Sequence, residues 1–263
     1  MSAAPIVLIG LERPEVDELR SRISRPLIAF EILPKIQLRG GELFVGRLGT
    51  WDWTGPVAAV VFHGIYENDL PTFAALALWG GPCLPSAHGM LDCRPRIPNL
   101  ARVRRVSRFA ALPRGYTDPG TTFTPDAPTV AKWGEWHCGE GKELVAATWT
   151  ATEPTLFEPF LTGDAVRVTA IGDQIWQFLM GGEHWKKTVH HSDTRLMPTD
   201  PVLADDVRTM QDDFDLSVCA ADYIIRPDGS RHLLELNHIP DVTAFPDVRA
   251  AYLTFAAHWM EKR

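Results

Sequence analysis

Three side chains that end in oxygen atoms lie close to the C-terminus of the 263-residue chain: Asp222, Glu235 and Asn237. If Asp228-Gly229 forms a two-residue turn between two strands, residues 222 and 235 lie directly opposite each other and share one face of the hairpin. Side chains alternate along a strand, so Asn237 shares the face of Glu235. Carboxylate and amide oxygens are ligands that Mg²⁺ takes, commonly beside phosphate and water. This spacing predicts a magnesium site; a polar hairpin face in contact with solvent is the alternative.

The prediction depends on the register of the hairpin. A three-residue turn would place Asp222 opposite Leu236, on the other face of the sheet. In the two-residue register the opposite face is mostly apolar, and it carries Tyr223, Ile225, His232, Leu234 and Leu236. A face of this kind suits a protein core, and it therefore favours the two-residue turn.

A second candidate group is cationic. Lys132 ends the extended segment 129–132, and a loop with three glycines follows over residues 133–142. The backbone N–H groups of such a loop can close over a phosphate, and an exposed turn is the alternative. Residues 94–108 carry six arginines and no acidic residue. This stretch predicts a solvated helix face or, as the alternative, a site for a phosphate or a substrate anion.

The N-terminal elements that would support these groups alternate between two patterns. Residues 6–9 form a short apolar run, and apolar residues at helical spacing follow as far as Ile23. The apolar run 57–62 precedes Asp69-Leu70-Pro71, which is typical of a helix start. Strands that alternate with helices predict a parallel sheet.

The pattern changes after a proline-rich stretch at 94–128, where a domain boundary is predicted. Extended segments then dominate, at 130–132, 144–149, 156–160, 167–171, 174–178, 222–226 and 231–236. Their hairpin turns favour antiparallel pairing. Helices are predicted from Asp200-Pro201 and around Tyr252. The predicted fold class is α/β, with α+β character in the C-terminal half.

The last hairpin also carries a resemblance. Its segment Leu234-Glu235-Leu236-Asn237-His238-Ile239-Pro240, with Asp222 on the preceding strand, is similar to the closing motif of ATP-grasp enzymes. It looks closest to the branch that contains ribosomal-protein glutamate ligases and D-alanine ligases. The resemblance implies that Asp222, Glu235 and Asn237 are magnesium ligands. In that family a glycine often follows the proline, whereas Asp241 stands here.

Other parts of the family pattern follow in the same order along the chain. Lys132 resembles the lysine that contacts the phosphates of the nucleotide, and the loop 133–142 resembles the mobile loop whose backbone, at Gly139 for example, covers them. The segment 156–161 resembles the linker between the lid and the catalytic core, which implies that Glu158 and Phe160 lie beside the nucleotide.

Two further positions match the family's catalytic cations. The segment 163–168 resembles the one that supplies a catalytic arginine, which would be Arg167. Lys186 and Lys187 match a basic residue that faces the γ-phosphate, and we expect Lys186 to bind the nucleotide and Lys187 to be catalytic. The family often has an asparagine shortly after this position, and Thr188 stands here.

The resemblance implies an ATP-grasp fold with a Rossmann-like N-terminal unit at 1–93, a small central lid at 94–157 and an antiparallel catalytic core at 158–263. It implies a ligase that uses ATP and Mg²⁺ to activate a carboxylate as an acyl phosphate, which an amine or another nucleophile then attacks. The alternatives are a small-molecule kinase with the same fold and a nucleotide-binding module without turnover.

Composition limits the partners. A net charge of -7 argues against a broad surface for nucleic acid, and no apolar segment has the length of a membrane span. Four scattered cysteines without a C-x-x-C pair support neither a zinc site nor a redox motif. We expect a cytoplasmic protein whose partners are a small-molecule or peptide carboxylate and a nucleophile. The oligomeric state stays open, a homodimer included.

Overall fold

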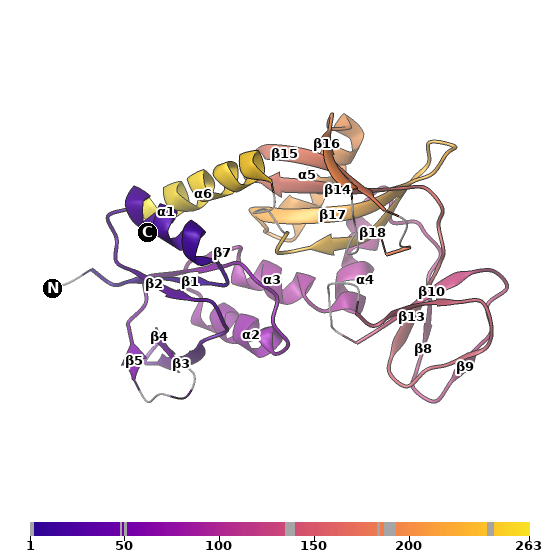
Figure 1. Ribbon diagram of the computed structural model, residues 1–263. Coiled ribbons are helices and arrows are strands. Elements are labelled where there is room, and N and C mark those ends of the chain that lie inside the picture. Colours follow the sequence, from indigo (N-terminus) through magenta and orange to yellow (C-terminus); the bar gives the residue numbers. More distant parts are fainter. Residues whose placement is uncertain are drawn as a thin grey trace.

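A parallel sheet forms the N-terminal part of the chain (Figure 1), as the alternation of strands and helices predicted. The computed structural model describes residues 3–47, 49, 52–134, 140–182, 185–186, 193–240 and 245–263. The strand order is β2 (Leu27–Phe30), β1 (Ile6–Ile9), β6 (Ala59–Phe62) and β7 (Cys83–Leu84), and all neighbours are parallel. Every residue of β1 and β6 is buried, as expected for parallel strands that are covered on both faces.

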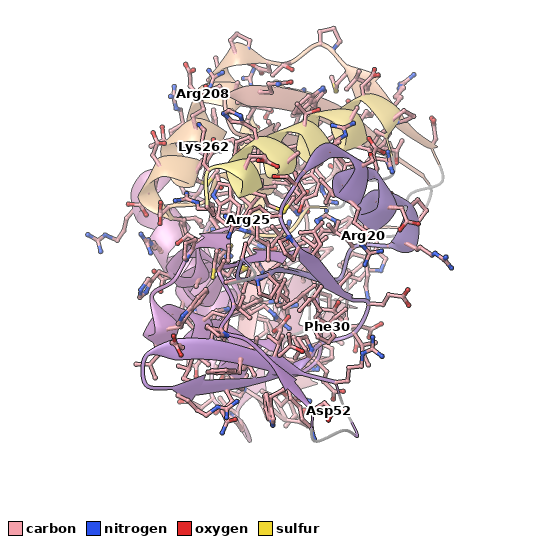
Figure 2. The ribbon with its side chains drawn as sticks, turned by 90° about the vertical axis from the view of Figure 1, so that its left-hand side faces the viewer. Arg20, Arg25, Phe30, Asp52, Arg208 and Lys262 are labelled. Atoms are coloured by element: carbon pink, nitrogen blue, oxygen red, sulfur yellow. The ribbon has the colours of Figure 1, made fainter. Side chains whose placement is uncertain are left out.

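Helices cover both faces of this sheet. Alternate residues of β1 pack with α1 (Arg13–Arg22) and α6 (Pro246–Glu261) on one face, and with α2 (Asp69–Trp79) and α3 (Ala87–Cys93) on the other. Figure 2 shows α6 beside α1, with Arg20 at the outer surface of α1. Arg249 of α6 donates to Glu15 at 2.8 Å and to Glu18 at 2.7 Å, which fixes the C-terminal helix on the N-terminal unit.

A small antiparallel sheet between β2 and β6 was not predicted. It consists of β3 (Lys35–Arg39), β4 (Glu42–Gly46) and β5 (Trp53–Thr54). It packs against the parallel sheet through Leu43 and Val45, which are buried.

The middle of the chain forms a second, smaller sheet, at the right of Figure 1. Its antiparallel order is β11 (Lys142–Val145), β10 (Thr129–Trp133), β13 (Thr155–Pro159) and β8 (Gly115–Thr117). A separate pair, β9 (Thr122–Phe123) and β12 (Trp149–Thr150), covers it. We call this sheet, with the pair that covers it, the lid. Its core is small: Ala131, Val145 and Phe157 are buried, and aromatic rings pack around them.

The third sheet is antiparallel and has the order β16 (Asp193–Met197), β15 (Gln174–Gly181), β14 (Asp164–Ile171), β17 (Val218–Ile225) and β18 (Arg231–Asn237). α4 (Arg96–Val106) and α5 (Pro201–Asp213) bury one face of it. Asp200 is the N-cap of α5, as predicted: its side chain accepts from the N–H of Val202 at 2.9 Å. The predicted hairpin at 171–174 is present, with Gly172 at a φ of 53°.

The hairpin of β17 and β18 pairs Asp222 with Glu235 as predicted, but its turn differs from the predicted one. Ile225 pairs with Arg231, and the N–H of Arg226 donates to the carbonyl of Ser230 at 2.9 Å, so the predicted two-residue turn is wrong. Three residues, 227–229, make the turn, and Gly229 takes the left-handed φ of 81° that such a turn requires. A bulge then shifts the register by one residue between the pair Tyr223–Leu233 and the pair Asp222–Glu235.

The bulge restores the pair that matters for the site. Asp222 lies opposite Glu235, whereas Tyr223 lies opposite Leu233. Leu233 is therefore the residue in the core, and Leu234, which was predicted to face the core, lines a cavity instead.

The predicted division of the chain at residues 93 and 157 stays a prediction.

Candidate active site

A row of charged side chains crosses three neighbouring strands of the C-terminal sheet. Arg167 of β14 lies opposite Asp222 of β17, which in turn lies opposite Glu235 of β18. The guanidinium of Arg167 binds the Asp222 carboxylate at two points, Nε to Oδ1 at 2.8 Å and Nη2 to Oδ2 at 2.9 Å. Because Asp222 has no exposed surface, this two-point contact is what compensates the loss of its hydration.

Asn237 completes the group that was predicted to hold metal. Its Nδ2 donates to Oδ2 of Asp222 at 3.3 Å, so the amide lies beside the carboxylate. An ionised carboxylate has about four acceptor positions, and the bonds from Arg167 and Asn237 bring three donors to Asp222. The donor set of Asp222, Glu235 and Asn237 fits Mg²⁺ by its chemistry, because all three offer hard oxygen atoms from one region of a sheet. Within the described residues, no cluster of three or more His, Cys, Asp or Glu side chains forms another candidate metal site.

The lid contributes two lysines to the opposite side of the site. Lys132 of β10 and Lys142 of β11 are directly paired across the strands, so they share one face of the lid sheet. Lys142 Nζ lies 3.2 and 3.1 Å from the two carboxylate oxygens of Glu235. The side chains of this pair are 9% and 16% exposed, and the pair connects the lid to the C-terminal sheet.

Lys132 belongs to a buried triad with Glu158 and Arg114. Its ammonium forms an ion pair with Oε1 of Glu158, and Arg114 Nε donates to Oε2 at 3.2 Å. All three side chains are at most 4% exposed. Burial lowers the pKa of Lys132, and the neighbouring ammonium of Lys142 adds to the effect, while Glu158 opposes it.

A cavity of about 270 Å³ lies between the lid and the C-terminal sheet. Its lining includes four of the predicted nucleotide residues: Lys132, Glu158, Phe160 and Lys186. The remaining walls are largely apolar, and they come from Val130, Pro159, Leu161, Ala165, Trp185, Ile224 and Leu234. A cavity with apolar walls and cations at one side suits a ligand that joins a flat ring to an anionic tail.

The cavity adjoins the charged row. Ala165 pairs with Ile224, two residues before Arg167 on β14 and two residues after Asp222 on β17, so all four side chains share one face of the sheet. Lys142 lines the cavity and also contacts Glu235. The structure therefore brings the predicted nucleotide residues and the predicted metal residues to one place. Two predicted residues, Gly139 and Lys187, lie outside the described part of the chain.

The basic stretch 94–108 is only partly the solvated face that the sequence predicted. Arg104 and Arg105 are exposed, but Arg94 and Arg96 are 2% and 6% exposed. Arg94 binds Asp69 at 2.7 Å and the carbonyl of Tyr66 at 3.2 Å. These arginines are buried because acids and carbonyl groups from distant segments meet them, and the local sequence does not show those partners.

Arg96 contacts both ends of the glycine loop. Its Nη1 donates to the carbonyl of Trp133 at 2.7 Å and to that of Gly141 at 3.3 Å, and its Nη2 donates to the carbonyl of Glu140 at 3.3 Å. The N–H of Trp133 also donates to Gly141 at 2.8 Å, so the base of the loop is closed by the backbone. Sequence reasoning missed this role, together with the contacts of Arg114 and Lys142.

No protein-family model and no curated protein sequence matches the chain. Solved structures do match over nearly the whole length. D-alanyl-alanine synthetase A from Vibrio cholerae superposes with a TM-score of 0.68 at 12% identity, over 100% of this chain and 98% of that one. The macrocyclase MdnC from Microcystis aeruginosa, bound with its precursor peptide, gives 0.63 at 13% identity, over 96% and 98%. The ATP-grasp ligase PsnB, in complex with a minimal precursor, Mg and ADP, gives 0.64 at 17% identity, over 100% and 99%.

The chain therefore has the ATP-grasp fold, as its C-terminal motif predicted, and its structural neighbours are of the ligase type that the sequence indicated. No helix in the described ranges is both long enough and apolar enough to span a membrane.

Proposed function

We propose that the chain is a ligase that uses ATP and Mg²⁺ to convert a substrate carboxylate into an acyl phosphate, which an amine or another nucleophile then attacks. The observation that carries the proposal is the row of Arg167, Asp222 and Glu235, which adjoins a cavity with lysines on its lid side. Phosphoryl transfer needs positioned charge rather than a protein nucleophile, and this arrangement supplies it.

The apolar part of the cavity is suited to the adenine ring, and Lys132 and Lys186 are placed to offset the charge of the phosphates. Asp222, Glu235 and Asn237 would hold Mg²⁺, which when bound would neutralise negative charge on the phosphates. Arg167 is positioned by its two bonds to Asp222, so that its cation offsets charge on the transferring phosphoryl group and later on the tetrahedral oxyanion. The role of Glu158 beside the nucleotide is part of the same proposal, with its carboxylate holding Lys132 in place.

The reaction balances without a further reactant. An oxygen of the substrate carboxylate forms a bond to the γ-phosphorus as the bond to ADP breaks. The nucleophile then bonds to the acyl carbon, phosphate leaves, and an attacking amine loses a proton.

The neighbours suggest the class of substrate. One of them is bound with a precursor peptide, another is in complex with a minimal precursor, and a third is named for the synthesis of D-alanyl-alanine. We therefore propose a small-molecule or peptide carboxylate and a nucleophile as co-substrates. We also propose a cytoplasmic location.

The test is product analysis with Mg·ATP, a panel of amino acids, dipeptides and acidic peptides, and hydroxylamine as a trap. A ligase gives a hydroxamate with the trap, and releases phosphate when both co-substrates are present. A stable phosphorylated acceptor would identify a kinase instead, and nucleotide binding without ADP release from any acceptor would identify a binding module. Arg167→Lys is the matched control, because it keeps the charge but loses the two-point geometry, and it should abolish hydroxamate formation while nucleotide still binds.

A further inference from the structure

The contact between Lys142 and Glu235 is a direct link between the lid and the proposed metal site. Lys142 Nζ lies almost midway between the two oxygens of Glu235, at 3.2 and 3.1 Å. Lys142 lies on β11, an edge strand of the lid sheet, and Glu235 lies on β18, an edge strand of the C-terminal sheet. The two side chains are 9% and 16% exposed, so solvent screens the pair only weakly.

An ammonium in this position occupies the carboxylate as a cation would. Lys142 contacts both oxygens of Glu235, so it competes for that carboxylate with a divalent ion held by the set of Glu235, Asp222 and Asn237. A Lys142 that stays in place therefore disfavours metal binding at Glu235, by competition for the same two oxygens and by repulsion between like charges.

The cavity offers Lys142 a second anionic partner. Lys142 lines the nucleotide cavity directly opposite Lys132 on the neighbouring strand. The two ammonium groups are close enough that Lys142 contributes to the lowered pKa of Lys132. Two neighbouring lysines on one wall of a cavity repel each other, and a polyphosphate between them relieves that repulsion.

We propose that Lys142 is a residue that exchanges partners, a step that rests on the proposed function: without ligand it holds the carboxylate of Glu235, and with metal and nucleotide bound it contacts the polyphosphate. The Lys142–Glu235 pair then keeps the lid against the core and the metal site closed to a divalent ion alone. Metal and nucleotide enter together, because the nucleotide supplies the anion that draws Lys142 away from Glu235.

The test compares Lys142→Met with the wild type in two calorimetric titrations. Methionine keeps the apolar stem and removes the charge. Mn²⁺ alone should bind the variant about tenfold more tightly than the wild type, which corresponds to a coupling of about 1.4 kcal/mol. Mg²⁺ with a non-hydrolysable ATP analogue should bind the variant about tenfold more weakly, because the lysine contact to the phosphates is lost. The opposite signs of the two changes are the signature of partner exchange.

Lys186→Met is the matched control, because it removes a positive charge from the lining of the same cavity and leaves both members of the Lys142–Glu235 pair in place, and it should leave the affinity for Mn²⁺ alone unchanged. Lys142→Arg should keep the affinity for Mn²⁺ alone as low as in the wild type, because arginine also binds a carboxylate. This variant preserves the ion pair, so it serves as the test if Lys142→Met does not fold. Equal affinity for Mn²⁺ in wild type and Lys142→Met, or an equal gain in Lys186→Met, would overturn the exchange while the proposed function stands. Failure of the wild type to bind the Mg·nucleotide complex would overturn both.

Discussion

Substitutions in the buried triad of Lys132, Glu158 and Arg114 should affect the free energy of unfolding and the affinity for nucleotide to different degrees. Glu158 is the single acid of the triad, and its two oxygens face one cation each. Glu158→Gln changes neither size nor shape by much, but it leaves two buried cations without their counter-charge. Breaking a buried pair in this way costs about 3–5 kcal/mol.

Lys132→Met should cost less than about 2 kcal/mol, because Glu158 keeps the bond from Arg114 at 3.2 Å. Removal of the lysine also removes an ammonium whose burial is unfavourable, as its lowered pKa indicates. The wild type should therefore be the most stable, Lys132→Met less stable and Glu158→Gln the least stable. Affinity for Mg·ATP should fall in Lys132→Met although most of the stability remains.

Urea unfolding, followed by circular dichroism and by the fluorescence of the lid tryptophans Trp133 and Trp149, measures the effect. With a urea dependence of about 3 kcal/mol per molar, the midpoint of Glu158→Gln should fall by about 1 M or more. Glu143→Gln makes the same chemical change at an exposed position of β11, and it should change stability by less than about 0.5 kcal/mol. A Glu158→Gln variant that is as stable as Lys132→Met, or more stable, would refute the argument.

Three further predictions concern the site itself. Glu235→Gln should lower the rate of ATP turnover by about 100-fold or more with little loss of fold, and unchanged turnover at saturating Mg²⁺ would exclude Glu235 as a metal ligand. Arg96→Met should speed hydrogen exchange at the amide of Trp133, which closes the base of the loop, and should weaken nucleotide binding; an unchanged exchange rate would mean that the backbone bond suffices. Because the pKa of Lys132 lies below its ordinary 10.5, its charge and the affinity for nucleotide should fall as pH rises toward that value, and Lys132→Arg should remove this dependence in a fluorescence titration.

Much of the fold followed from periodicity alone. The buried runs of β1 and β6, the N-cap of α5 at Asp200 and the hairpin at Gly172 are properties of short segments. Each depends on residues a few positions apart, where apolar alternation, capping groups and glycine act directly on the backbone. The sheet of β3, β4 and β5 was missed although the sequence carries a signal for it, because Lys35–Arg39 alternates polar and apolar residues and two glycines follow at the turn.

The pairing of Asp222 with Glu235 shows where local reasoning reaches its limit. The pair was predicted from a two-residue turn, but the chain makes a three-residue turn and then corrects the register with a bulge. The burial pattern was therefore a sound guide to which face carries the carboxylates and a poor guide to Leu233 and Leu234. A bulge depends on packing against both sides of the sheet, and alternation in one strand does not reveal it.

The sequence by itself determined most of the elements outside the sheet of β3, β4 and β5, the polar residues that end the last hairpin and their order relative to Lys132 and Arg167. Only the tertiary structure decided that Arg114 binds Glu158, that Arg96 closes the base of the loop and that Lys142 lies on Glu235. The partners in these three contacts are 44, 37 and 93 residues apart. A charged side chain carries no local mark of its distant partner, because burial and the approach of opposite charge arise only when separate sheets pack together.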